Sequence, residues 1–109
     1  MLCQHGYGDT GENWAGTGIG GPSMCLQLVD RGYDVWMGNN RGTKHSNVND
    51  KDDGSWSFYE RWNFTYADMG LYDMPAMIDK ILEVTEKPKL TIIGYSQGSA
   101  QTYYGMVHN

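Results

Sequence analysis

Residues 90–100 read LTIIGYSQGSA, and this stretch decides the fold class. Its first part, Leu90–Ile93, is rich in β-branched residues and predicts a buried strand. Gly94-Tyr95-Ser96-Gln97-Gly98 then fits the G-x-S-x-G nucleophile elbow, in which a strained strand-to-helix turn lifts the serine hydroxyl clear of the sheet. Small residues and a helical stretch follow. The pattern predicts Ser96 as a catalytic nucleophile, with side chains at Gly94 and Gly98 excluded by the neighbouring strand and helix.

A second short block lies near the start of the chain. Met1–Gln4 is apolar enough to end a buried strand, and His5-Gly6-Tyr7 follows directly. The elbow fold takes one oxyanion N–H from the residue after the nucleophile and another from the loop after an earlier strand. We therefore expect the backbone N–H groups of Gln97 and Tyr7 to form the oxyanion hole.

A serine hydroxyl needs a histidine to accept its proton and an acid to orient that histidine. His108 lies on the helix that Ser96 begins, about 18 Å farther along it, which is too far. His45 belongs to a long loop, and His5 precedes the oxyanion loop. Since the triad order of this fold is serine, acid, histidine, we expect both the acid and the histidine to be missing from these residues.

The remaining pattern predicts strands that alternate with helices in a single domain. We expect a glycine-rich loop at 5–21, a helix from Pro22 to Gly32, a strand at 33–37 and a polar, aromatic loop from 38 to about 62. A helix at 66–86 follows, which Pro75 either starts or kinks. Another helix runs from Gln97. This order predicts an α/β fold with a parallel sheet and crossover helices.

Composition excludes several functions. The chain has 109 residues and a formal net charge of -5, without a Lys or Arg block that would indicate nucleic acid or an anionic membrane. No apolar run approaches the roughly 20 residues of a membrane span, and no signal-peptide pattern opens the chain. Residues 16–21 match G-x-G-x-x-G by chance, since no strand directly precedes them. We expect no cofactor.

The chain also contains two cysteines and one N-glycosylation sequon. Cys3 and Cys25 are too few for a disulfide framework and have no metal-ligand spacing, so we expect free, packed thiols and no metal site. Asn63-Phe64-Thr65 is an N-glycosylation sequon, which has meaning only in a secreted protein.

Several ordered blocks together resemble the acid lipase family, the gastric and lysosomal lipases and their sterol-esterase relatives. The blocks are LCQHG at 2–6, GYDVWMGNNRG at 32–42, WNFTYADM at 62–69, YDMPAMID at 72–79 and GYSQG at 94–98. They span almost the whole chain, and their order is more specific than any one of them. Tyr7 stands where the family usually has leucine, and Tyr95 where it usually has histidine.

The resemblance implies an α/β-hydrolase core that cleaves lipid esters, such as acylglycerols or sterol esters, at a lipid–water interface. It implies Ser96 as nucleophile and Tyr7 and Gln97 as backbone oxyanion donors. The family's acid, histidine and cap domain lie downstream, so residues 1–109 correspond to the N-terminal part of the domain, with the C-terminal half of the core absent. The strands near Met1, Tyr33 and Leu90 would lie side by side, with the first in the middle. A lysosomal or secreted location also follows from the family.

Two other functions remain open at this stage. One is a non-catalytic, hydrolase-like binding protein, and the other is an esterase or thioesterase for small soluble substrates. Asn39, Arg41 and Asp73 could look catalytic, but we interpret them as loop-fixing residues because the triad roles belong elsewhere. The aromatic residues Trp56, Trp62 and Phe64 are interpreted as packing the long loop.

Overall fold

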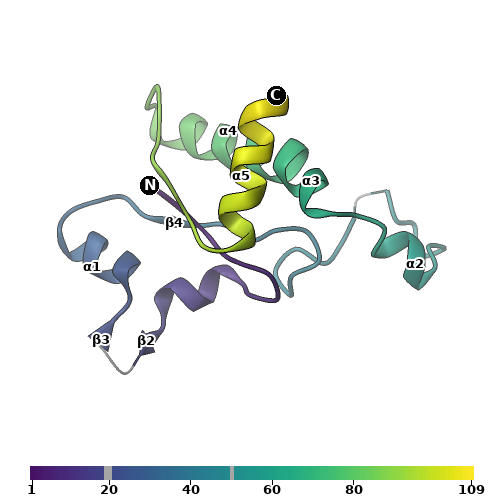
Figure 1. Cartoon of the computed structure of the whole chain (residues 1–109), viewed down its shortest axis with the longest axis horizontal. Coiled ribbons are helices and arrows are strands. Elements are labelled where there is room, and N and C mark those ends of the chain that lie inside the picture. The colour runs from purple at the N-terminus through teal and green to yellow at the C-terminus, as the bar shows by residue number, and fades with distance from the viewer. Residues whose placement is uncertain (19–20, 50) are drawn as a thin grey trace.

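A parallel sheet lies at the centre of the chain in the computed structural model, which describes residues 1–18, 21–49 and 51–109 (Figure 1). Its strands are β1 (Leu2–Gln4), β4 (Trp36–Met37) and β5 (Ile92–Gly94), in the order β4-β1-β5. Leu2 pairs with Trp36 on one side and with Ile92 on the other. The predicted parallel sheet, with the first strand in the middle, is confirmed.

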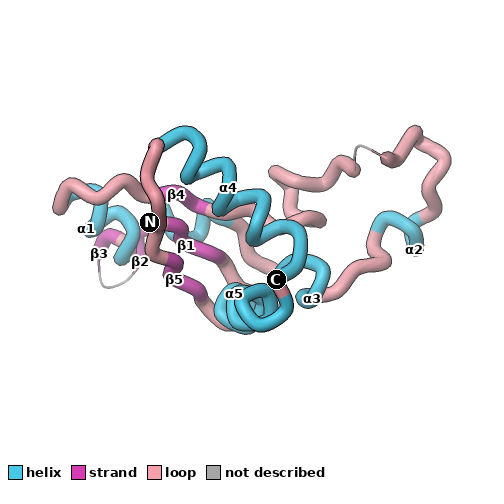
Figure 2. The backbone as a smooth tube through the Cα atoms, turned by 90° about the horizontal axis from the view of Figure 1, so that it is seen from above, coloured by secondary structure: helices cyan, strands magenta, loops and turns pink. Residues whose placement is uncertain are grey.

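Helices follow each strand of the sheet. They are α1 (Met24–Asp30), α2 (Phe58–Arg61), α3 (Tyr66–Asp68), α4 (Met74–Thr85) and α5 (Gln97–His108). Side chains on a strand alternate between its faces, and β1 uses both. Leu2 packs with Met74 and Ile81 of α4 in the buried core, whereas Cys3 is bonded to α1. Helices α4 and α1 therefore cover opposite faces of the sheet (Figure 2).

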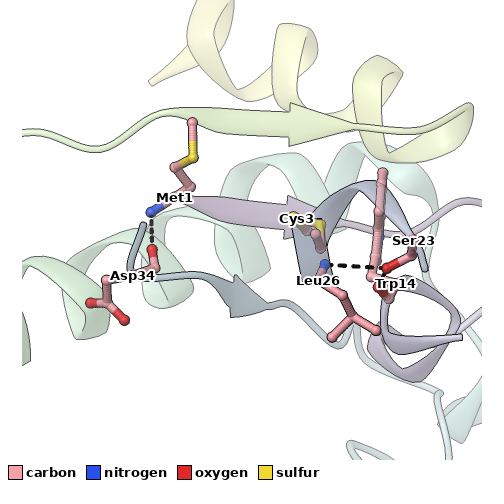
Figure 3. The surroundings of a disulfide bond; sticks show 7 residues. Met1, Cys3, Trp14, Ser23, Leu26 and Asp34 are labelled. Carbon is pink, nitrogen blue, oxygen red and sulfur yellow. Dashed lines mark hydrogen bonds between the residues drawn. A yellow bond between two sulfur atoms is a disulfide. The ribbon is translucent and has the colours of Figure 1, made fainter. Parts of the chain in front are cut away.

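The prediction of two free thiols was wrong. Cys3 of β1 and Cys25 of α1, both fully buried, form a disulfide across 22 residues of sequence (Figure 3). Counting cysteines did not reveal the bond, because their proximity depends on how α1 packs against the sheet. The same region is held by the Ser23 hydroxyl, which donates to the Trp14 carbonyl and accepts from the N–H of Leu26 at 3.4 Å.

Some expected boundaries differ from the structure. Helix α1 begins after Ser23, because the Ser23 hydroxyl caps it, and Pro22 instead lies in β3 (Gly21–Pro22), which pairs with β2 (Thr17–Gly18). The first loop also contains a 3₁₀ turn, η1 (Gly11–Ala15). Two residues of the G-x-G-x-x-G stretch, 19 and 20, lie outside the described residues. Only Trp36–Met37 of the expected 33–37 strand is paired.

Helix α2 lies inside the segment that was expected to be loop. Ser57 and Glu60 form a capping box there: the Glu60 carboxylate accepts the N–H of Ser57 at 2.7 Å, and Ser57 Oγ accepts the N–H of Glu60 at 3.3 Å. This is the S-x-x-E signature of a helix start, so the sequence did contain a signal for α2. Figure 1 shows α2 at the end of the molecule farthest from α1.

The expected helix at 66–86 is interrupted by a wider turn. Helix α3 continues into a π-helical segment, η2 (Met69–Asp73), before α4. Pro75 lies in the first turn of α4 and has no N–H for the preceding turn, which is a common cause of such irregularity. Gly70 of η2 and Gly105 of α5 touch through their backbones, since a β-carbon on Gly105 would lie 2.4 Å from the Gly70 carbonyl oxygen.

Candidate active site

The turn between β5 and α5 has the backbone expected of a nucleophile elbow. Ser96 has φ 51° and ψ -118°, a conformation that non-glycine residues rarely adopt, and it precedes the first residue of α5. The residue is exposed. The strained turn thus places Ser96 at the C-terminal end of the parallel strands, as the sequence pattern predicted.

The two elbow glycines are required by sterics. A β-carbon on Gly94 would lie 2.8 Å from Ser99 Cα and N, within the first turn of α5. A β-carbon on Gly98 would lie 2.5 Å from the Gln4 carbonyl oxygen and 2.6 Å from that of His5. The prediction that flanking side chains would clash with the helix and the neighbouring strand is confirmed, and the contact at Gly98 draws the elbow tightly against the end of β1.

The loop after β1 lies directly beside Ser96. A β-carbon on Gly6 would be 3.2 Å from Ser96 Cβ and 3.3 Å from the Tyr95 carbonyl oxygen. Tyr7 follows Gly6 and is 85% exposed. The loop that contains Gly6 and Tyr7 therefore lies next to Ser96, and Gln97 follows Ser96 in the chain.

The backbone N–H groups of Tyr7 and Gln97 are not used in the hydrogen bonds of these two segments. In α5, the N–H groups of Gly98, Ser99 and Ala100 bond to the carbonyls of Tyr95 and Ser96. Among the described residues, neither the N–H of Gln97 nor that of Tyr7 has a hydrogen-bond acceptor. The Gln97 side chain turns away and donates to Met69 Sδ at 3.2 Å. Free N–H groups at a helix start favour a developing negative charge.

A buried polar cluster lies beneath the site, formed by Gln4, His5, Asn40 and Gln101. Asn40 is its centre: Oδ1 accepts from Gln4 Nε2 at 3.0 Å and from Gln101 Nε2 at 2.8 Å, while Nδ2 donates to Gln101 Oε1 at 2.9 Å. The cluster joins β1, the loop after β4 and α5, so it fixes three segments relative to one another.

His5 connects that cluster to the loop that contains Gly6 and Tyr7. Its Nε2 accepts the N–H of Asn40 at 3.1 Å, so its Nδ1 carries the proton and donates to the Gly6 carbonyl at 2.8 Å. In a trans peptide the N–H points opposite to the C=O. Holding the Gly6 carbonyl therefore fixes the direction of the Tyr7 N–H.

Sequence reasoning missed this cluster apart from the weak signal at His5. Gln4 ends an apolar strand, which was a sign that its polar side chain had a partner. Gln101 lies between Gly98 and Gly105 at helical spacing, on the one face of α5 that is buried. The pattern indicated a buried face but could not name its partner.

The residues interpreted as structural do fix loops. Asn39 Oδ1 accepts the N–H of Gly11 at 2.9 Å. Asp73 accepts from the Arg41 backbone at 2.9 Å and from its guanidinium at 2.7 Å, and Arg41 also lies over the rings of Phe64 and Tyr72. These bonds anchor the segment after β4 to the helices, and that interpretation is confirmed.

Among the described residues, none of the three histidines forms a hydrogen bond with Ser96. His5 is engaged in the buried cluster, and the ring of His108 lies 4.3 Å from that of Tyr104. His45 pairs with Glu12 at 2.8 Å. Hydrogen bonds from Lys44, and then from His45, lower the pKa of the Glu12 carboxyl. The three histidines thus make other contacts.

Groups of metal ligands and membrane-spanning helices are absent from residues 1–18, 21–49 and 51–109. Within these ranges, no group of three or more His, Cys, Asp or Glu residues could hold a metal ion. Over the same ranges, no helix is long and apolar enough to cross a membrane.

Comparison with known proteins gives one family and several relatives. Residues 1–104 match the family described as alpha/beta hydrolase fold. The chain is 43% identical to lipase 1 of Drosophila melanogaster over 100 residues, 90% of the chain. It is 41% identical to a probable lipase of Schizosaccharomyces pombe over 105 residues, 93% of the chain. Human lysosomal acid lipase/cholesteryl ester hydrolase is 38% identical over 103 residues, 91% of the chain. The matches cover only 22–24% of the length of these relatives.

Proposed function

The chain belongs to the α/β-hydrolase fold family, and from this premise we propose that it carries the nucleophile and oxyanion hole of a carboxylic ester hydrolase for lipid esters. The observation that carries the proposal is the elbow: an exposed Ser96 with positive φ, packed against the loop that contains Gly6 and Tyr7. A surface serine in an ordinary glycine-rich turn would have no reason to adopt this strained backbone.

In the proposed reaction, Ser96 Oγ attacks the carbonyl carbon of the ester. The hydroxyl proton passes to a histidine base supplied by the whole protein, outside residues 1–109. The tetrahedral oxyanion accepts hydrogen bonds from the N–H groups of Tyr7 and Gln97. The C–O bond to the alcohol then breaks, the alcohol leaves with the proton, and water hydrolyses the acyl–serine ester.

The substrate class rests on the relatives. The resemblance to acid lipases is confirmed by the match to human lysosomal acid lipase, whose name includes cholesteryl ester hydrolysis. The relatives from fly and fission yeast are also named as lipases. We infer that the whole protein hydrolyses long-chain acylglycerols or sterol esters, at the interface between lipid and water.

A chain-length series of esters tests both the reaction and the substrate. The whole protein is assayed with esters of one alcohol, from acetyl to long acyl chains, beside its Ser96→Ala variant. We expect turnover to persist with long chains and to fall at least about a thousandfold in the variant.

The other outcomes identify the rival functions. Turnover that declines steadily from acetyl to long chains would contradict a lipid substrate and favour an esterase for small soluble molecules. Lipid binding without Ser96-dependent turnover would contradict an enzyme and favour a binding protein.

A further inference from the structure

The region around α2 exposes aromatic side chains without a cover. Phe58 is 69% exposed, Tyr59 84% and Trp62 49%. Together with Glu60 and Asn63 they line a surface pocket of about 350 Å³. That volume lies at the lower end of the ~300–1,000 Å³ range of small-molecule pockets. A group of exposed apolar rings around one pocket is usually covered by another part of the molecule or used to bind a partner.

Asn63, which lines this pocket, begins the sequon Asn63-Phe64-Thr65, the one N-x-S/T sequence among the 109 residues. It is exposed, and none of the described residues forms a hydrogen bond with its side-chain amide. The segment lies between α2 and α3, at the end of the molecule away from α1 (Figures 1 and 2). The amide is therefore accessible, and a bulky group could be attached there without disturbing the fold.

The disulfide supplies an independent observation about compartment. Cys3 and Cys25 are bonded and fully buried, so the bond belongs to the folded core and not to a reactive surface pair. Stable structural disulfides form in oxidising compartments, which are those of the secretory pathway in eukaryotic cells. The same pathway attaches glycans to asparagine sequons.

We propose that Asn63 carries an N-linked glycan and that its first N-acetylglucosamine packs into the aromatic pocket beside α2. In the attachment step, Asn63 Nδ2 forms a bond to C1 of the sugar on a lipid-diphosphate-linked oligosaccharide. The C1–O bond to the diphosphate breaks, the lipid diphosphate leaves, and the amide loses one proton to a base. The C–H faces of the sugar then lie on the rings of Phe58, Tyr59 and Trp62, removing apolar surface from water.

Peptide mass spectrometry of the full-length protein, secreted from a eukaryotic host, tests the modification. Asn63 should be glycosylated in the natural protein and in Thr65→Ser, which keeps the sequon. It should be unmodified in Thr65→Ala. Asn63→Gln should lose the corresponding glycopeptide, whereas Asn49→Gln, outside any sequon, should leave it intact. Secreted protein with the Cys3–Cys25 bond formed but Asn63 unmodified would overturn the proposal.

Hydroxyl-radical footprinting tests the packing. Oxidation of Phe58 and Tyr59 should be lower in the glycosylated protein than in Asn63→Gln or after enzymatic removal of the glycan. Equal oxidation in all three forms would overturn the packing. Low oxidation of both residues in all three forms would mean that another segment of the protein covers the pocket. High oxidation in all three forms would mean that the glycan extends into solvent.

Discussion

At the scale of single residues, Gly98 shows how the G-x-S-x-G motif depends on the fold, because it packs against the end of β1. We expect Gly98→Ala to lower the free energy of unfolding by about 1–3 kcal/mol, because overpacking of this kind forces backbone shifts. The new β-carbon would lie 2.5 Å from the Gln4 carbonyl oxygen, so the elbow must move away from β1. Chemical denaturation of the whole protein measures the loss, and the rate of ester hydrolysis should fall with it.

The matched control is Gly16→Ala. Gly16 has φ -70°, and a β-carbon there would meet only the Asn13 carbonyl oxygen, at 3.6 Å. This substitution should leave stability unchanged or raise it by up to about 1 kcal/mol. If the two variants were equally stable, the tight contact at Gly98 would not exist in solution.

His5 is expected to act as a positioning residue for the oxyanion hole. Its Nδ1 holds the Gly6 carbonyl, and its Nε2 accepts from Asn40. We expect His5→Ala to lower kcat by up to about a hundredfold, since loss of a whole oxyanion donor costs 10²–10³. KM should change little, because the donor acts on the transition state.

A conservative variant separates positioning from simple folding. His5→Gln can still donate or accept one of the two bonds and should recover part of kcat. A fall in stability with kcat unchanged would show that His5 only fills the core.

The elbow could be predicted from its sequence motif, whereas the buried polar cluster beneath it could not. The G-x-S-x-G motif is local, so the strained turn at Ser96 and the close contacts of Gly94 and Gly98 could be predicted from local sequence. Gln4, Asn40 and Gln101 come from β1, the loop after β4 and α5, and their contact depends on the packing of all three. A single sequence shows that each of these three residues is polar among apolar neighbours. It does not show that their side chains contact one another.

At the scale of elements, the disulfide joins the central strand to α1 and encloses the loop that contains Gly6 and Tyr7. Closing a loop across 22 residues restricts the unfolded chain, for which loop entropy gives about 3 kcal/mol. We expect the Cys3→Ala, Cys25→Ala double variant to lose about that much unfolding free energy in chemical denaturation of the whole protein. Reductant should destabilise the natural protein and leave the variant unchanged. Equal stability of the oxidised and reduced protein would contradict a structural bond.

Helices and strands were predicted best where apolar residues form a continuous run or recur at helical spacing. The β-branched run before the elbow and the apolar spacing at 66–86 gave β5 and α4. Strand β4 was shorter than expected because only Trp36 and Met37 pair with β1. Short α2 was overlooked although its capping box was visible, since four residues carry no helical period.

At the scale of the whole molecule, residues 1–109 are extended and thinly packed. The radius of gyration is 14.8 Å, against about 13 Å for a compact domain of this length. Among the described residues, the buried apolar cluster consists of Leu2, Met74 and Ile81, and β4 and β5 are both edge strands. Open apolar edges promote association between chains.

We therefore expect residues 1–109, expressed alone, to aggregate or to melt without cooperativity, and to show no Ser96-dependent ester turnover. Size-exclusion chromatography, thermal melting and an esterase assay measure these properties. A soluble monomer that melts cooperatively and loses esterase activity in Ser96→Ala would contradict this expectation and would establish residues 1–109 as a complete, minimal enzyme.

We propose Ser96 as the nucleophile, and covalent labelling of the whole protein by a fluorophosphonate tests this role. The strained, exposed elbow and the free N–H groups of Tyr7 and Gln97 predict one phosphonylated residue, Ser96, identified by peptide mass spectrometry. Ser99→Ala, three residues along α5, should label normally, whereas Ser96→Ala should not label. Labelling that persists in Ser96→Ala at any other serine would contradict the role of Ser96 as the nucleophile.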